Sequence, residues 1–276
     1  MSEKQQSPNL SRRCLVSSLG TAAAGGLIAS AAAGVKAAPA QAQEVGASVP
    51  SILVFDINET TLDIEYTAPV FERVFGDKAV LREWFAQLIL YSNAISLAGP
   101  YVTFFELGEG LLKMLADIHR VSVKPSDVEE LRHRFATLPA HPDVEQGLTQ
   151  LKAAGFRLVA FTNSPPVHPS PAENAGLGKF YEREFSIDRV RRFKPAPQCY
   201  HMVAEEIDVE LSECGMVAAH VWDTLGAQSA GYSGAALITR GVNAPLPVHR
   251  IPQPQIVAPD FIGLATQAAK LWRRGG

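Results

Sequence analysis

The sequence predicts an α/β fold in which a helical cap is inserted after the first strand of a Rossmann-like parallel sheet. Residues 52–55 are all apolar, as expected for a strand buried on both faces of such a sheet. The next strand pattern, FRLVAFTNS, begins only at residue 156. Apolar residues recur at helical spacing in the gap between them, and strand and helix patterns alternate after residue 140.

The region after residue 140 has the pattern of repeated strand and helix units. Helices are predicted over 141–155, 171–181, 197–207 and 224–231, and strands over 156–164, 183–188, 215–223 and 234–240. Because crossovers between parallel strands are right-handed, these units are expected to build one sheet. The proline-rich tail from 242 to 255 is predicted to be irregular, with a last helix over 260–274.

The inserted segment, about residues 66–139, is predicted to form the helical cap over the strand ends. Four stretches in it carry apolar residues at helical spacing, namely 68–76, 79–99, 104–121 and 125–138. The core of the domain is then divided in the sequence, with one part at about 50–65 and the other at 140–276.

The composition suits one globular domain over about residues 43–276. Of the 276 residues, 47% are hydrophobic, which is enough for a sizeable core. The 25 Lys and Arg residues nearly balance the 28 Asp and Glu residues, and no dense basic run follows residue 42. The chain therefore lacks the electrostatic footprint of a nucleic-acid-binding protein. It also lacks the His and Cys spacing of a zinc site.

Residues 1–42 resemble a signal for the twin-arginine export machinery. Arg12 and Arg13 precede a weakly apolar stretch that reaches Gly34, and AQA at 40–42 forms a small-residue cleavage site. An uncleaved membrane anchor is the alternative, but a span needs about 20 strongly apolar residues, whereas this stretch is rich in Ala, Gly and Ser. We therefore expect export of a folded protein to the periplasm or beyond, with no stable membrane anchor after cleavage.

Polar side chains gather where the predicted elements meet the carboxyl edge of the sheet. They are Asp56, Asn58 and Thr60 after the first strand, Thr162 and Asn163 after the second, Lys194 before a helix, and Asp223 after the fourth strand. An isolated Asp56 is equally well explained as a cap of the following turn. Because the carboxyl ends of parallel strands meet at one edge, the whole set is expected to converge in one crevice.

The order and spacing of these residues resemble the motifs of the haloacid dehalogenase superfamily, and specifically its L-2-haloacid dehalogenase branch. The first motif, an Asp with a Thr four residues later, matches Asp56 and Thr60, and the second matches Thr162 and Asn163. The third motif matches Lys194, Pro195 and Tyr200, and the fourth matches Trp222 and Asp223. YVTF at 101–104 is similar to the cap segment of that branch.

The resemblance implies that Asp56 is a nucleophile, and the residue chemistry agrees. A carboxylate that attacks an electrophilic carbon forms an ester, which water then opens. Lys194 would keep Asp56 ionised, and Asp223 would position Lys194 or the hydrolytic water. The other explanation of Lys194, a surface lysine at a helix start, is disfavoured by the helix dipole.

Two sets of site residues follow from the motifs. The expected catalytic set is Asp56, Thr60, Arg82, Lys194 and Asp223. The expected substrate-binding set is Asn58, Phe85, Thr162, Asn163, Tyr200, His220 and Trp222.

Two departures from the phosphatases of the superfamily favour a dehalogenase. Those enzymes carry a second Asp as general acid two residues after the nucleophile, whereas this chain has Asn58, and an amide cannot act as an acid. They also bring an additional acid near the fourth motif, where this chain has Ala218, Ala219 and His220. With fewer hard oxygen ligands, neither a magnesium site nor any other cofactor is expected.

The cap shows a departure from the dehalogenases as well. The position of their halide-receiving arginine falls on Phe85. Arg82 lies one helical turn earlier on the same face, and we expect it to point toward Asp56, so that Arg82→Ala lowers turnover by at least about 10²-fold. A solvated Arg82 on the outside of the cap is the alternative.

His220 and the aromatic residues near it each allow two interpretations. His220 either activates the hydrolytic water or packs beneath the cap. Phe85 and Trp222 either line an apolar pocket or only pack in the interior.

The function predicted from these motifs is hydrolytic dehalogenation of short 2-haloalkanoic acids, a class of small-molecule substrate. A phosphatase of the same fold and a non-catalytic periplasmic binding or accessory protein remain the alternatives. The physiological substrate, its stereochemistry and whether the chain forms a homodimer stay open at this stage.

Overall fold

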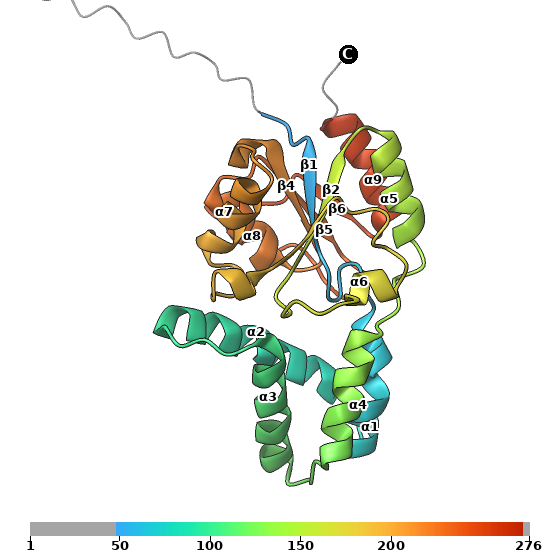
Figure 1. The fold of residues 1–276 in the computed structure, drawn as a ribbon, viewed down its shortest axis with the longest axis vertical. Helices are drawn as coiled ribbons and strands as arrows, with labels where there is room; N and C mark the ends of the chain where they lie inside the picture. The colour runs from blue at the N-terminus through green and yellow to red at the C-terminus, as the bar shows by residue number, and fades with distance from the viewer. Residues whose placement is uncertain (1–47, 273–276) are drawn as a thin grey trace, which may run out of the picture. The chain divides into compact units, whose positions relative to one another are not determined.

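The computed structural model describes residues 48–272, which are built around a six-stranded parallel sheet (Figure 1). The strands are β1 (Ile52–Asp56), β2 (Arg157–Thr162), β3 (Glu184–Ser186), β4 (Cys214–Ala218), β5 (Gly234–Ile238) and β6 (Ile256–Ala258). They lie in the order β3, β2, β1, β4, β5, β6, and every neighbouring pair is parallel. The chain order reverses beside β1, so its carboxyl end lies at the switch point where such sheets bind ligands.

Helices cover both faces of this sheet. On one side lie α5 (Val144–Ala153) and α9 (Phe261–Leu271), and on the other lie α7 (Pro197–Glu206) and α8 (Val221–Ala230) (Figure 1). Short 3-10 helices occupy Ile64–Thr67, Ile187–Arg189 and Leu211–Glu213. The result confirms the predicted α/β fold with a Rossmann-like parallel sheet.

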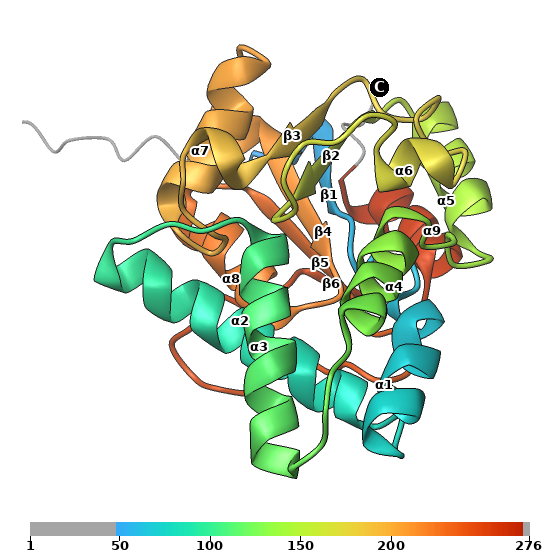
Figure 2. The ribbon, with the colours of Figure 1, turned by 60° about the horizontal axis from the view of Figure 1, so that its bottom comes forward.

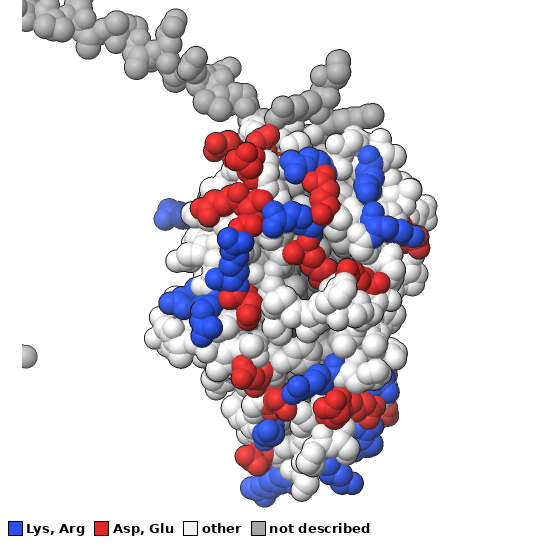
Figure 3. Space-filling view, in the orientation of Figure 1, with Lys and Arg blue, Asp and Glu red and all other residues white. Residues whose placement is uncertain are grey.

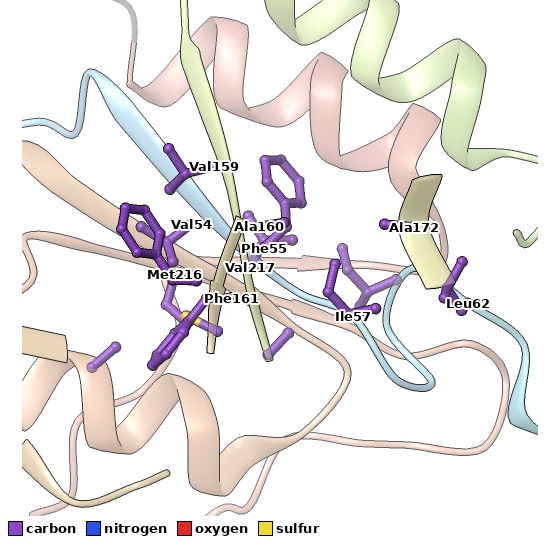
Figure 4. Close-up of a cluster of buried hydrophobic side chains, with 14 of the residues drawn as sticks. Val54, Phe55, Ile57, Leu62, Val159, Ala160, Phe161, Ala172, Met216 and Val217 are labelled. Atoms are coloured by element: carbon purple, nitrogen blue, oxygen red, sulfur yellow. The ribbon is translucent and has the colours of Figure 1, made fainter. Parts of the chain in front are cut away.

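The core forms where the apolar strands meet these helices. All residues of β1 and β4 are buried, and Figure 4 shows their side chains, among them Val54 and Met216, gathered with those of β2. Phe55 stacks on Phe261 of α9, with ring centroids 5.5 Å apart. Burial on both faces explains why β1 has an unbroken apolar sequence rather than an alternating one.

Four helices between β1 and β2 form the cap over the carboxyl ends of the strands (Figure 2). They are α1 (Ala68–Phe75), α2 (Val80–Ala98), α3 (Phe104–His119) and α4 (Pro125–Ala136). Trp84 of α2 joins them, because its indole N–H donates to Gly108 O at 2.9 Å and its ring packs against Phe71 and Phe135. The cap therefore has an apolar centre of its own, as amphipathic helices require.

The structure differs from the sequence prediction in three local features. The predicted helix over 171–181 is limited to α6 (Pro171–Asn174), because Gly176 adopts a left-handed φ of 76° soon after it. A strand that was not predicted, β6, follows directly after the irregular tail of 242–255 and pairs with β5. β4 ends at Ala218, so Trp222 and Asp223 lie in the first turn of α8 and not on a strand.

The surface in Figure 3 carries Lys and Arg side chains interspersed with Asp and Glu side chains. Within residues 48–272, no helix has the length and apolar character needed to cross a membrane. The predicted export signal at residues 1–42 lies outside the described residues.

Candidate active site

The Asp56 carboxylate stands at the end of the central strand and is held by the loop that follows. The Thr60 hydroxyl donates to Asp56 Oδ2 at 2.6 Å, and the Thr61 hydroxyl donates to the backbone oxygen of Asp56 at 2.7 Å. The backbone N–H of Ala219 donates to Thr60 Oγ1 at 2.8 Å. Since that oxygen accepts a bond from Ala219, its single hydrogen is directed at Asp56. The orientation of the carboxylate is thereby determined by β1, its loop and the end of β4.

Lys194 is fully buried, and its ammonium group joins three parts of the sheet edge. Nζ donates to Asp56 Oδ1 at 2.8 Å, to Asp223 Oδ2 at 2.7 Å and to the backbone oxygen of Phe161 at 3.2 Å. Asn163 Oδ1 accepts the backbone N–H of Lys194 at 3.0 Å and so positions the lysine. An ammonium group has three hydrogens, so Lys194 has none left for another partner.

Tyr200 supplies a second hydrogen-bond partner for the Asp223 carboxylate. The Tyr200 hydroxyl donates to Asp223 Oδ1 at 2.7 Å, while Lys194 occupies the other carboxylate oxygen. Gly226 permits this approach of α7 and α8, because a Cβ atom there would lie 2.6 Å from the Tyr200 hydroxyl oxygen. Tyr200 is fully buried beneath Asp223. Tyr200 does not line the cavity at Asp56, where a substrate-binding residue is expected, and its hydroxyl holds Asp223 instead.

Burial and charge shift the pKa values of these three groups. Burial by itself raises the pKa of Asp56, but the charge of Lys194 and the contact with His220 outweigh it and hold that pKa below the usual range. Burial lowers the pKa of Lys194, but the charges of Asp223 and Asp56 raise it above its ordinary value. Burial, together with the charge of Asp56, raises the pKa of Asp223. Asp56 is therefore an ionised carboxylate at neutral pH, as a nucleophile must be.

A second cluster of charged side chains lies between the core and the cap. His220 Nε2 is 2.7 Å from Glu59 Oε2, and His220 Nδ1 is 3.8 Å from Asp56 Oδ2. The Arg82 guanidinium forms ion pairs with Glu59 and with Glu65. We call Glu59, His220 and Arg82 the cap-side cluster. We call Asp56, Lys194 and Asp223 the sheet-edge cluster.

Glu59 is the residue that sequence reasoning missed. It is buried, and its φ of 68° lies in the left-handed region that non-glycine residues rarely adopt. In the sequence it is one more polar residue of a turn, and its only distinguishing mark is its place three residues after Asp56. Its partner His220 lies 161 residues further along the chain.

Arg82 does not reach Asp56, contrary to the prediction. Its side chain is 39% exposed and ends at the carboxylates of Glu59 and Glu65. The physical reason is the buried carboxylate of Glu59, which stands nearer to Arg82 than Asp56 does and would be costly to leave without a cation. Arg82 is therefore linked to Asp56 through Glu59 and His220.

Two cavities meet at the site. The smaller, of about 10 Å³, opens on Asp56, Asn58 and Asn163, and the larger, of about 590 Å³, opens on Glu59 and Arg82. Four side chains border both cavities: Phe85, Ile89, His220 and Trp222. The small cavity holds about one water molecule. A bound substrate therefore requires a shift of these bordering side chains or of the cap.

The remaining predicted residues shape the loop after β2. Thr162 Oγ1 accepts the backbone N–H of Ser164 at 3.0 Å, and Asn58 Nδ2 donates to Ser164 Oγ at 3.1 Å. Thr162 borders a neighbouring cavity of about 190 Å³ rather than the one at Asp56. Among residues 48–272, no three His, Cys, Asp or Glu side chains are arranged to hold a metal ion.

A buried carboxylate held by a lysine, at the edge of a capped parallel α/β sheet, is typical of enzymes that attack their substrate through an aspartate. The family model of the haloacid dehalogenase-like hydrolases matches residues 50–231, and the chain belongs to this family.

The relatives of this chain include dehalogenases and a phosphatase. An (S)-2-haloacid dehalogenase of Xanthobacter autotrophicus is 25% identical, over 76% of this chain and 89% of that enzyme. A solved structure of an L-2-haloacid dehalogenase has a TM-score of 0.74 and 25% identity, covering 79% of this chain and 98% of that one. A phosphoglycolate phosphatase of Colwellia psychrerythraea is 25% identical, over 70% of this chain and 85% of that enzyme.

Proposed function

We propose that this protein hydrolyses short 2-haloalkanoic acids and releases halide, with Asp56 as the nucleophile. The observation that carries the proposal is the ionised Asp56 carboxylate, held by Lys194 at 2.8 Å and Thr60 at 2.6 Å in front of a small cavity with both polar and aromatic walls. Covalent catalysis by a carboxylate needs this combination of charge, orientation and exclusion of water. The 2-haloacid dehalogenases among the relatives support the same class of substrate.

The reaction takes two steps. In the first, Asp56 Oδ2 bonds to the carbon that carries the halogen, and the carbon–halogen bond breaks with its electron pair leaving on the halide. In the second, water attacks the carbonyl carbon of the ester, which releases the 2-hydroxy acid and a proton and regenerates Asp56. Lys194 stays at Oδ1, where it stabilises the negative charge that develops on the ester carbonyl oxygen during the second step.

A phosphatase is the second candidate, because a phosphoglycolate phosphatase is among the relatives. Loss of an alkoxide from phosphate requires an acid near the leaving oxygen, and Asn58 cannot supply that proton. Its amide is instead used as a donor to Ser164 Oγ at 3.1 Å. A halide is a weak base that leaves without a proton, so Asn58 is compatible with dehalogenation.

Halide release from 2-chloropropionate separates these candidates. We expect the purified protein to release halide equally with and without EDTA, and Asp56→Asn to lower the rate by at least about 10⁴-fold. Magnesium-dependent phosphate release from phosphoglycolate, with no halide release, would establish the phosphatase instead. A folded protein that releases neither product would be a binding or accessory protein.

We also propose that residues 1–42 direct export through the twin-arginine machinery. The support is the Arg12-Arg13 pair ahead of the weakly apolar stretch and the small-residue site at 40–42. Cell fractionation of the full chain and of an Arg12→Lys, Arg13→Lys variant tests this. The variant is expected to stay inside the cell, and equal export of both chains would contradict the proposal.

A further inference from the structure

The proposed first step leaves a negative charge on the halide. The cations near Asp56 differ in whether they have a hydrogen available to bind it. The three hydrogens of Lys194 are all bound, to Asp56, Asp223 and the backbone oxygen of Phe161. The guanidinium of Arg82 is paired with two carboxylates on the side of the larger cavity. Neither group has a donor directed at the small cavity.

His220 does have such a donor. Its Nδ1 atom is buried, has no hydrogen-bond partner among residues 48–272, and lies 3.8 Å from Asp56 Oδ2, beyond hydrogen-bond distance. The ring stacks on Trp222 with centroids 5.2 Å apart and contacts Phe85 at 5.6 Å. These aromatic neighbours restrain the ring, which borders the small cavity, so its unpaired nitrogen stays beside the nucleophile.

Glu59 holds the other side of the imidazole. It accepts from Nε2 at 2.7 Å, and this bond leaves Nδ1 as the nitrogen that faces the site. Glu59 keeps this position although its left-handed backbone, with a φ of 68°, is unfavourable for a residue with a side chain. Its carboxylate is thus maintained at a conformationally unfavourable place, which is typical of functional sites.

We propose that His220, held by Glu59, is the donor that receives the leaving halide during ester formation. Its imidazolium N–H at Nδ1 forms a hydrogen bond to the halide as the carbon–halogen bond breaks, and no proton is transferred. His220 is the catalytic residue of the pair, because it touches the leaving group, and Glu59 is a positioning residue. The inference rests on the proposed dehalogenation and assigns the acceptor of the leaving group within that reaction.

The charge state required of His220 agrees with its surroundings. Burial by itself lowers the pKa of His220, but contacts with Asp56 and Glu59 and their charges raise it to about 9. The charged groups that face the ring are Asp56 of β1 and Glu59 of the following loop. Behind them lie the groups paired with these carboxylates, namely Arg82 of α2 and Lys194 before α7, and then Asp223 of α8, which pairs with Lys194. The imidazole is therefore protonated at neutral pH.

Single-turnover measurements with His220→Asn test the proposal. Enzyme in excess is mixed with 2-chloropropionate or 2-bromopropionate, and the ester on Asp56 is followed by rapid quenching and mass spectrometry. We expect ester formation from the chloride to slow by about 10² to 10³-fold, as for loss of one charge-stabilising donor, and formation from the bromide to slow clearly less. Ester hydrolysis should keep its wild-type rate.

His141→Asn is the matched control. His141 also contacts Glu59, through the backbone oxygen at 3.0 Å, but it does not border the cavity at Asp56. His141→Asn should leave the ratio of the ester-formation rates from the chloride and the bromide unchanged.

Three outcomes overturn the proposal. Equal losses in the rate of ester formation from the chloride and the bromide would mean that His220 does not bind the leaving halide. Normal ester formation with slow ester hydrolysis would make His220 the base for water, while the proposed dehalogenation would stand. No halide release by the wild-type protein would remove both this inference and the proposed function.

Glu59→Gln supplies a second test that does not depend on the folding of His220→Asn. It keeps the imidazole but removes one of the two negative charges that raise the pKa of His220. The wild-type rate of ester formation should fall as the pH rises through about 9, and in Glu59→Gln the fall should begin at lower pH. An unchanged pH limit would show that Glu59 has only a structural role and would contradict the proposed pair.

Discussion

The sheet-edge cluster holds a cation between two carboxylates, whereas the cap-side cluster holds a carboxylate between two cations, and their hydrogen bonds differ as well. In the sheet-edge cluster all three hydrogens of Lys194 are used, and its residues are at most 7% exposed in their side chains. In the cap-side cluster His220 keeps one nitrogen without a partner among residues 48–272, and Arg82 is partly in solvent. The sheet-edge arrangement suits side chains that must stay in place, and the cap-side arrangement suits side chains that must bind a ligand.

The origin of the two clusters explains this difference. In the sheet-edge cluster, Asp56 ends β1, Asp223 lies in the first turn of α8, and Lys194 is fixed to β2 through the backbone oxygen of Phe161. The hydrogen-bonded strands β1 and β2 therefore help to set the distances within it. The cap-side cluster joins a loop, a cap helix and the start of α8, so a shift of the cap alters its geometry. Substrate entry requires a shift of the cap or of the side chains that border the cavity, because the cavity at Asp56 is only about 10 Å³.

The largest expected effect is that of Lys194→Met, which breaks the sheet-edge cluster. Two buried carboxylates would then face each other without a cation, and breaking such a network costs about 3 to 5 kcal/mol of stability. Urea denaturation should show this loss, and halide release should be abolished because Asp56 is no longer held as an ion. Lys179→Met, at an exposed pair with Glu145, is the control and should leave stability nearly unchanged. Equal midpoints for the two variants would contradict the role given to Lys194.

The second prediction uses the pH dependence of stability to separate the clusters. The pKa of His220 is raised to about 9 in the folded protein, whereas an unfolded histidine has about 6.5. The folded state therefore binds the extra proton between these values, so its stabilisation is complete below pH 6.5 and is lost as the pH rises through about 9. Denaturation midpoints should reveal a decline on the order of 1 to 3 kcal/mol across this window.

His220→Asn should remove that decline, because the titrating group is gone. A decline of equal size in the variant would show that another residue is responsible and that the His220 imidazole is neutral in the folded protein.

The smallest expected effect is that of Arg82→Ala. Because Arg82 is linked to Asp56 through Glu59 and His220, we expect a loss of about tenfold in halide release, about 1.4 kcal/mol, and not the 10²-fold that direct contact with the halide would give. Arg73→Ala is the matched control, since Arg73 is also a cap arginine paired with two carboxylates, Asp127 and Glu130. A loss of halide release for Arg82→Ala as large as that for His220→Asn would indicate that Arg82 binds the leaving halide.

Much of the sheet-edge cluster could be predicted because its signals are local. An unbroken apolar run places Asp56 at the end of a buried strand, and Lys194 stands at a helix start where a cation without a function is unfavourable. The less local details were predicted poorly. Asp223 was expected on a strand but lies on α8, and Tyr200 was expected at the substrate but lies behind Asp223.

By itself, the sequence determined the parallel sheet, the inserted helical cap and the convergence of Asp56, Lys194 and Asp223, because strand periodicity and chain order already place these residues at one edge. Only the tertiary structure decided how Glu59, His220 and Arg82 pair. Glu59 lies 23 residues from Arg82 and 161 from His220 in the chain, and no local pattern relates them. Their contacts depend on how closely the cap packs on the core, and a difference of a few ångströms determines which carboxylate a cation reaches.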